Sequence, residues 1–187
     1  DPADGSVKAT ITGSPWTDTS QRGLAYDPTT DVFFIGGWNE GVIYRVAGPS
    51  HATPGETLGQ CSPDDPSISG LAYNMAFGLL WEATNSETDT IYLLDPTTCE
   101  VLRTLPHPDG GGYGGAGLEI DGIGNLWTVG QNTQNAYLVE SGLPVSVGLS
   151  YRRHELARMR SSVRDRVEDS GRHAMHSLEF GLTTLGT

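Results

Sequence analysis

The stretch Gly23-Leu24-Ala25-Tyr26-Asp27 returns twice in the chain at a fixed spacing. It recurs as Gly70-Leu71-Ala72-Tyr73-Asn74 and as Gly117-Leu118-Glu119-Ile120-Asp121, each time 47 residues further along the chain. A further run, from Asp1 to Ile11, matches the run from Asp95 to Leu105 at an offset of 94 residues, which is twice that spacing. Self-similarity at one period and at its double indicates a tandem repeat.

Each repeat contains short apolar runs separated by turn sequences such as Asp-Pro-Thr-Thr. The runs are rich in β-branched and aromatic residues and too short for helices, so they predict strands. In an unbroken register of 47 residues, the second runs of the three repeats are Val32–Ile35, Leu79–Glu82 and Leu126–Val129. The third runs, each with a tyrosine near the middle, are Val42–Val46, Thr90–Leu94 and Ala136–Val139.

Four short strands in a period of 40 to 50 residues are typical of a β-propeller blade. We therefore expect an all-β fold, a partial β-propeller of about three four-stranded antiparallel blades, with strands a to d in each blade. The incomplete propeller spans 1–145. Its parts are strand d of a preceding blade at 1–15, blades at 21–62 and 69–106, and a blade at 116–142 that lacks its last strand. One blade cannot bury both faces of its sheet alone, so the array must close or be capped.

The charge of the repeat region excludes several kinds of partner. Residues 1–150 contain 18 acidic and 4 basic residues, a formal charge of −14. Nucleic acids and anionic membrane surfaces need a positive footprint, so neither is expected as a partner. No apolar run is long enough to cross a bilayer. The acidity suits solubility outside the cell or cations as partners, so we expect a secreted, extracellular chain without a cofactor, with calcium left open.

The two cysteines stand in neighbouring repeats. Cys61 follows strand d of one blade, and Cys99 lies in the turn between strands c and d of the next. In an oxidising compartment a disulfide between them would join adjacent blades. The alternative is two unpaired thiols that lie too far apart for a disulfide. No Cys or His cluster has metal-ligand spacing, so no metal site is predicted.

The chemistry of the sequence changes in the tail, 146–187. Residues 151–187 hold seven of the eleven basic residues and three of the five histidines. This arginine-rich tail could be a helix, because four apolar residues recur at helical spacing. These residues are Leu156, Met159, Val163 and Val167. The alternatives are a disordered appendage and the product of a reading-frame slip in a GC-rich gene.

We find no catalytic motif, and we predict no catalytic residue. The glycine-rich run Gly110–Gly115 joins a strand d to a strand a rather than a strand to a helix. It predicts a flexible connection rather than a phosphate cradle. Glu119 replaces the alanines Ala25 and Ala72 of the other repeats on strand a, which lines the channel of a propeller. Glu119 is therefore a channel-facing candidate, with a solvated surface position as the alternative.

The candidate ligand-binding residues follow strand b. In the 47-residue register Trp38, Asn85 and Asn132 are equivalent. Binding residues often lie on loops that a rigid scaffold positions, such as the loops at one end of the blades. Polar residues beside an exposed tryptophan suit a sugar or a peptide. The alternative is ordinary turn chemistry. The candidates are Trp38, Asn39, Glu40, Asn85, Glu87 and Asn132.

Three longer stretches carry a resemblance to a known family: Gly23–Thr30, Leu80–Thr98 and Asp121–Gln131. They resemble propeller repeats of secreted bacterial multidomain proteins, and in particular the non-catalytic propeller of actinobacterial subtilisin-like (S8-type) serine peptidases. Similar repeats occur in streptogramin lyases and gluconolactonase-like enzymes. No peptidase motif matches any residue of this chain, so the resemblance carries over no catalytic residue.

These features favour a non-catalytic binding or spacer module of a secreted bacterial protein that the resemblance implies to be a serine peptidase. Its ligand would be a protein, a peptide or a carbohydrate. The alternative is a fragment of a propeller enzyme of the lactonase or streptogramin-lyase type that uses a divalent metal. The matched channel-side residues Arg22, Ser69 and Ala116 supply no ligand set, which counts against an enzyme. A second alternative is an assembly module, in which the open blade edges close a ring by homodimerisation.

Overall fold

The computed structural model describes residues 1–144, 155–159 and 161. The chain divides into one unit over Asp1–Val147 and a second over Gly148–Thr187. In the described part of the first unit, one short 3-10 helix precedes a series of strands. The elements are η1 (Trp16–Asp18), β1 (Gln21–Asp27), β2 (Val32–Gly37), β3 (Val42–Ala47), β4 (Thr57–Cys61), β5 (Ile68–Asn74), β6 (Leu79–Thr84), β7 (Thr90–Leu94), β8 (Val101–Pro106), β9 (Gly115–Ile120), β10 (Leu126–Gly130) and β11 (Asn135–Val139).

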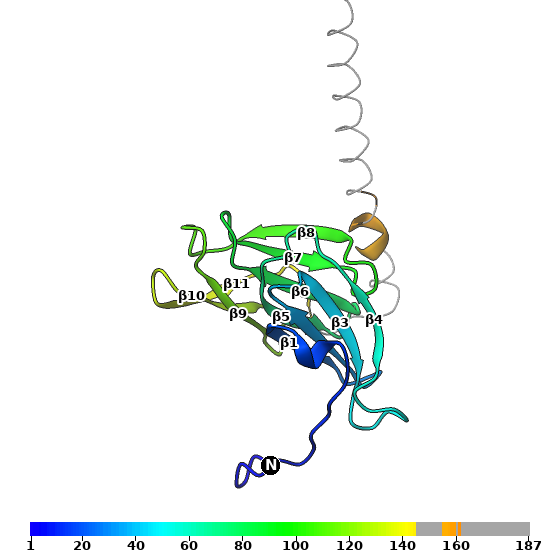
Figure 1. The fold of residues 1–187 in the computed structure, drawn as a ribbon. Coiled ribbons are helices and arrows are strands. Elements are labelled where there is room, and N and C mark those ends of the chain that lie inside the picture. The colour runs from blue at the N-terminus through cyan, green and yellow to red at the C-terminus, as the bar shows by residue number, and fades with distance from the viewer. Residues whose placement is uncertain (145–154, 160, 162–187) are drawn as a thin grey trace, which may run out of the picture. The chain divides into compact units, whose positions relative to one another are not determined.

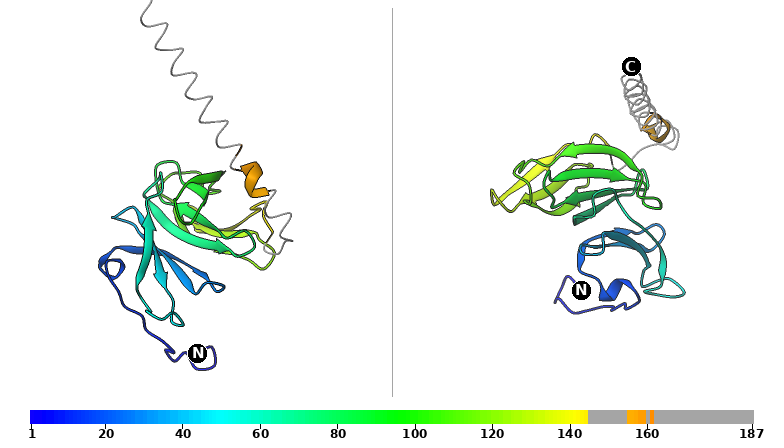
Figure 2. Two further views of the ribbon diagram at one scale, coloured as in Figure 1. Left: turned by 90° about the vertical axis from the view of Figure 1, so that its right-hand side faces the viewer. Right: turned by 45° about the horizontal axis from the view of Figure 1, so that its top comes forward.

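The strands form three antiparallel sheets in chain order (Figure 1). Strands β1–β4 form the first sheet, β5–β8 the second and β9–β11 the third. The innermost strands β1, β5 and β9 contact one another in turn, so neighbouring sheets meet along their first strands (Figure 2). This arrangement confirms the predicted all-β fold, a partial β-propeller of three blades. The third blade has three strands within residues 1–144.

The glycine that opens each repeated stretch allows the inner strands to come close. A Cβ atom on Gly70 would lie 2.5 Å from the backbone nitrogen of Leu118 in the next blade. A Cβ on Gly23 would lie 2.9 Å from the backbone nitrogen of Leu71, and Gly23 also has a positive φ of 76°. No side chain fits at these two contacts without moving a neighbouring strand, which explains why the stretch repeats with glycine.

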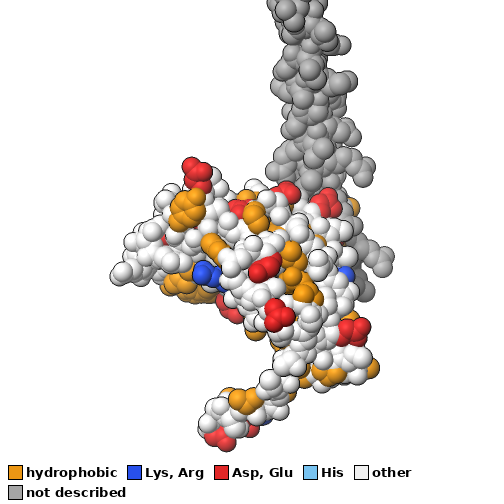
Figure 3. All heavy atoms as spheres, viewed as in Figure 1, with side chains coloured by type: hydrophobic (Ala, Val, Ile, Leu, Met, Phe, Trp, Pro, Cys, Tyr) orange, Lys and Arg blue, Asp and Glu red, His pale blue; other side chains and the backbone are white. Residues whose placement is uncertain are grey.

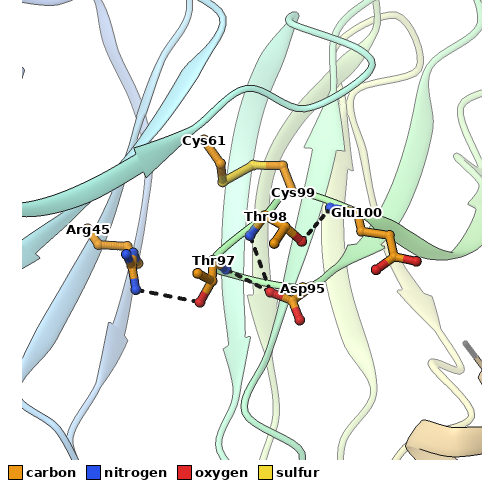
Figure 4. The surroundings of a disulfide bond; sticks show 7 residues. All are labelled: Arg45, Cys61, Asp95, Thr97, Thr98, Cys99 and Glu100. Carbon is orange, nitrogen blue, oxygen red and sulfur yellow. Dashed lines mark hydrogen bonds between the residues drawn. A yellow bond between two sulfur atoms is a disulfide. The ribbon is translucent and has the colours of Figure 1, made fainter.

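The first two blades share a hydrophobic core and a covalent link. Phe34 and Ile43 of the first blade pack with Leu71 and Leu80 of the second in one buried cluster. The predicted disulfide Cys61–Cys99 is confirmed, with a Cα–Cα distance of 5.6 Å (Figure 4). It joins the end of β4 to the turn between β7 and β8, and so connects adjacent blades as expected.

The third blade departs from the 47-residue register by one residue. In the second blade the turn between the first two strands closes with Asn74 opposite Leu79, whereas in the third blade Ile120 lies opposite Leu126. The pair equivalent to Ile120–Leu126 in the second blade is Tyr73–Leu80. Five residues separate the first pair and six the second, so the third blade is one residue shorter here, and Trp127 takes the place of Trp81. The predicted unbroken register is wrong from this turn onward.

The backbone hydrogen bonds that close the three inner strands show the same offset. The N–H groups of Trp38, Asn85 and Gln131 donate to the carbonyls of Ser20, Ser67 and Gly114. The counterpart of Asn85 in the third blade is therefore Gln131. The predicted equivalence of Asn85 with Asn132 is wrong.

The segment that precedes β1 forms no strand within residues 1–15. A strand d pairs with strand c of its own blade, and in this structure residues 1–15 pair with no described strand. The assignment of 1–15 to a preceding blade stays a prediction. Trp16 is buried, and its indole N–H donates to the carbonyl of Gly55 at 3.0 Å, which ties η1 to the first blade.

The second unit is described over 155–159 and 161, and these residues are helical. The guanidinium of Arg158 pairs with the carboxylate of Glu155 at 2.6 Å. The remainder of the arginine-rich tail, and with it the choice between a helix, a disordered appendage and a frame-slip product, lies outside the described residues. In the parts of the chain that the structure describes, no helix has the length and apolarity to span a membrane.

Candidate functional site

The glycine-rich connection between β8 and β9 is held in place by buried polar groups. The side chain of Asp89 is almost fully buried, and its Oδ2 accepts the N–H groups of Gly114 at 2.7 Å and Gly115 at 3.1 Å. A carboxylate that accepts two backbone N–H groups fixes the loop strongly. The connection that the sequence predicts to be flexible is therefore anchored at its carboxyl-terminal end.

Two of the predicted ligand residues serve the same connection. The side-chain amide of Asn85 donates to the carbonyl of Gly115 at 2.8 Å. The amide of Asn132 donates to the carbonyl of Gly112 at 3.1 Å, and its backbone N–H donates to Oδ2 of Asp109 at 3.1 Å. The structure thus brings Asn85 and Asn132 together around one loop, where their amides already bind backbone groups.

The anchored loop presents a tyrosine. The side chain of Tyr113 is 66% exposed, although its backbone has a φ of 53°, which residues other than glycine rarely adopt. Its N–H donates to the carbonyl of Ser86 at 2.6 Å, and Glu87 follows as an exposed side chain. An aromatic ring is therefore held outward on a backbone that its surroundings fix.

A buried histidine supports the base of this loop. Nδ1 of His107 accepts the N–H of Asp109 at 3.2 Å, so the proton of the neutral ring is on Nε2. Nε2 lies 2.9 Å from Oγ1 of Thr128, which in turn donates to the carbonyl of Gly117 at 2.9 Å. Burial lowers the pKa of His107 below its ordinary value of 6.5. An acid–base set of His107, Asp109 and Asp121 can be imagined from the sequence, but Asp121 lies at the opposite end of β9.

The three candidates of the first blade form a separate group. The guanidinium of Arg22 lies over the ring of Trp38, 4.6 Å from its centroid. Oε2 of Glu40 accepts the N–H of Ser20 at 3.2 Å, and Asn39 is exposed. The described contacts of these residues stay within the first blade, so they do not join the loop around Tyr113.

Glu119 lies beside a cavity along the inner strands. The cavity has a volume of about 240 Å³, and residues of all three inner strands line it, among them Leu24, Tyr73 and Glu119. Oε1 of Glu119 accepts the N–H of Ile120 at 2.9 Å, and the side chain remains exposed. Its role in a channel stays a prediction. Within the described residues, no three His, Cys, Asp or Glu side chains lie close enough together to hold a metal ion.

One unusual group was missed by the sequence reasoning. Glu82 in the middle of β6 is fully buried between the first two blades, and neither of its carboxyl oxygens has a hydrogen-bond partner among the described residues. Burial raises the pKa of Glu82 well above its ordinary value of 4.5, and the nearby charges of Asp65 and Asp64 act in the same direction. The signal in the sequence was an acid inside the apolar run Leu79–Thr84.

No protein-family model and no curated protein matches the chain. Among solved structures it is similar to a gluconolactonase from Xanthomonas campestris, with 19% identity and a TM-score of 0.45 over 60% of this chain and 35% of that one. It is also similar to a chain of the nidogen/laminin complex, with 20% identity and a TM-score of 0.45 over 67% and 50% of the two chains. A third is the aldose sugar dehydrogenase from Streptomyces coelicolor in its PQQ-bound form, with 22% identity and a TM-score of 0.38 over 62% and 38%. The chain thus spans between a third and a half of the length of these β-propeller proteins.

Proposed function

We propose that this propeller fragment is a binding module whose ligand is a carbohydrate, held at the loop Gly110–Gly115. The observation that carries this proposal is the outward ring of Tyr113 on a left-handed backbone. A tyrosine combines an apolar ring face with a hydroxyl, and it loses little conformational entropy when it binds. A loop that is already fixed before binding reduces the cost of ordering it on the ligand.

The surroundings of Tyr113 suit the hydroxyl groups of a sugar. The exposed carboxylate of Glu87 and the carboxamide of Asn132 stand on the two neighbouring loops that hold the glycine-rich connection. Together they offer hydrogen-bond acceptors and donors at the rim of an aromatic platform. A secreted setting fits this role, because a disulfide such as Cys61–Cys99 persists in an oxidising compartment. Attachment to a serine peptidase rests on the sequence resemblance alone and stays a prediction.

The test is Tyr113→Ala, with binding to a panel of oligosaccharides measured by calorimetry. We expect the affinity to fall by about tenfold or more, which corresponds to about 1.4 kcal/mol. The matched control is Ile123→Ala, because Ile123 is a similarly exposed apolar residue beyond the opposite end of β9. Equal affinity for both variants, or no binding by the unmodified chain to any member of the panel, would contradict the proposal.

The enzyme alternative has one observation in its favour. Glu119 places a carboxylate beside the cavity of the inner strands, where a reacting sugar lactone could lie. A divalent metal would need further ligands from blades outside this chain. Calorimetric titration with calcium and with zinc, run together with a lactone hydrolysis assay, separates the two functions. Stoichiometric metal binding with turnover that Glu119→Ala abolishes would support the enzyme over the binding module.

A further inference from the structure

Among the described residues, nothing packs as a blade on the face of the first blade that would meet a preceding blade. Leu24 on this face is 61% exposed, whereas its counterpart Leu71 in the second blade is 1% exposed under the first blade. The same open face holds an apolar pocket of about 410 Å³ lined by Leu24, Phe33 and Ile35, with Arg22 at its edge. Figure 3 shows hydrophobic side chains at the surface of the described residues.

Among the described residues, the third blade has an uncovered face on its other side, where a following blade would pack. Trp127 is 45% exposed, whereas its counterpart Trp81 is fully buried against the third blade. Val129 and Leu138 on this face are also exposed, and Glu119 adds a negative charge. The blades are copies of one repeat. The open face of the third blade is therefore equivalent to the face of the second blade that packs on the third, and it is expected to fit the open face of a first blade in the same way.

The outer edge of the third blade lacks a fourth strand among the described residues, and the amino-terminal run resembles one. In the second blade β7 pairs with β8, with Leu93 opposite Arg103 and Ile91 opposite Leu105. At the offset of 94 residues, Arg103 and Leu105 correspond to Ala9 and Ile11. The run at Asp1–Ile11 therefore has the pattern of the fourth strand that the described residues do not supply beside β11, and it pairs with none of the described strands.

The connection between this run and β1 resembles the connection that joins the second blade to the third. Eight residues separate Thr12 from β1, and eight residues separate β8 from β9. Trp16 of the first connection shares a buried cluster with Ile35 and Tyr44. In the second connection, His107 contacts the corresponding residues Thr128 and Tyr137.

We infer that two copies of this chain close into a six-bladed ring by exchanging their amino-terminal strands. Residues 7–11 of each copy pair with β11 of the other copy, with Ala9 opposite Leu138 and Ile11 opposite Ala136. The first-blade face around Leu24 then covers the third-blade face around Trp127 of the other copy. Arg22 and Glu119 give these two faces opposite charges. The exchange supplies the fourth strand that the described residues do not provide, and it covers both open faces. Since the two contacts are identical, they close the array rather than extend it.

Sedimentation equilibrium of the full chain at micromolar concentration tests the ring. We expect the mass of two chains, without larger species as the concentration rises. Leu24→Glu alone and Trp127→Glu alone should each give monomers. A mixture of the two variants keeps one intact interface, and it should recover a weaker dimer. A monomeric unmodified chain, or a mass that grows steadily with concentration, would overturn the inference.

Cross-linking tests the exchanged strand separately from the faces. The chain has no free cysteine within its described residues, so Ala9→Cys and Leu138→Cys can be placed on separate chains and mixed under mild oxidation. Antiparallel neighbours lie within disulfide distance, and we expect a covalent pair that contains one chain of each variant. Ala3→Cys mixed with Leu138→Cys is the control, and it should cross-link at least about tenfold more slowly. A dimer in sedimentation without the cross-link would mean that another segment pairs with β11, and would overturn the exchange.

Discussion

The two contacts between blades are built from the same repeat but by different chemistry. Between the first and second blades, apolar side chains and the disulfide Cys61–Cys99 hold the sheets together, and the buried Glu82 has no hydrogen-bond partner among the described residues. Between the second and third blades, Thr128 occupies the position of Glu82, and it bonds to His107. Each repeat therefore keeps the glycine contact at the inner strands and varies the groups further out.

One position after the outermost strand differs between the two contacts. His107 lies two residues after Leu105, which pairs with Ile91, and Pro63 lies two residues after Cys61, which pairs with Ile43. A proline has neither a backbone N–H nor a polar side chain to offer a carboxyl group. The first contact therefore depends on apolar burial and a covalent bond, and the second depends on a directed chain of hydrogen bonds.

The largest effect should come from Gly70→Ala, because its Cβ would lie 2.5 Å from the backbone of Leu118. The strand β9 must move, and we expect a loss of about 3 kcal/mol in the free energy of unfolding, at the upper end for overpacking. Hydrogen exchange should quicken in β9–β11 and change little in β1–β4, since the disulfide holds the first contact.

Gly122→Ala is the control for Gly70→Ala, because nothing lies within 4 Å of its Cβ position and its φ is not in the left-handed region. It should leave both the free energy of unfolding and the exchange of β9–β11 nearly unchanged. Equal exchange in the first and third blades of Gly70→Ala would show that the two contacts do not open independently.

The sequence predicted the features that depend on period and missed those that depend on neighbours. The 47-residue spacing predicts the blades and places Cys61 and Cys99 near each other, because a repeat fixes both strand order and turn positions. The offset of the third blade was missed because Leu126 and Trp127 read as strand residues in either register, and a shift of one residue exchanges the faces of a strand. An amide such as Asn85 gives no sign in the sequence of whether it binds a ligand or a backbone carbonyl.

A smaller effect should come from Glu82→Leu, which removes the buried carboxyl from the first contact. The raised pKa of Glu82 means that the folded state binds its proton more tightly than the unfolded state does. The contribution of Glu82 to the free energy of unfolding is therefore fully present below about pH 4.5, the ordinary pKa of a glutamate. It is lost as the pH rises toward the folded-state pKa. We expect Glu82→Leu to be more stable by about 1–3 kcal/mol at neutral pH, in urea unfolding, with a smaller gain at pH 4.5. A gain that is the same at both pH values would mean that the carboxyl group does not titrate in this range.

The smallest effect should come from His107→Gln in the second contact, and its dependence on pH should have the opposite sign. Burial lowers the pKa of His107, although the charges of Asp89 and Asp109 act against this, so the folded state binds the proton less tightly than the unfolded state. Stability due to the neutral ring is complete above the ordinary value of 6.5 and falls as the pH drops through it toward the folded-state pKa. NMR titration of the imidazole should give a midpoint below 6.5. The decrease in the free energy of unfolding at acid pH that is due to this ring should be about 1 kcal/mol or less, and His107→Gln should remove it. A midpoint above 6.5 would mean that the two carboxylates outweigh burial, and the second contact would then gain stability from acid as the first one does.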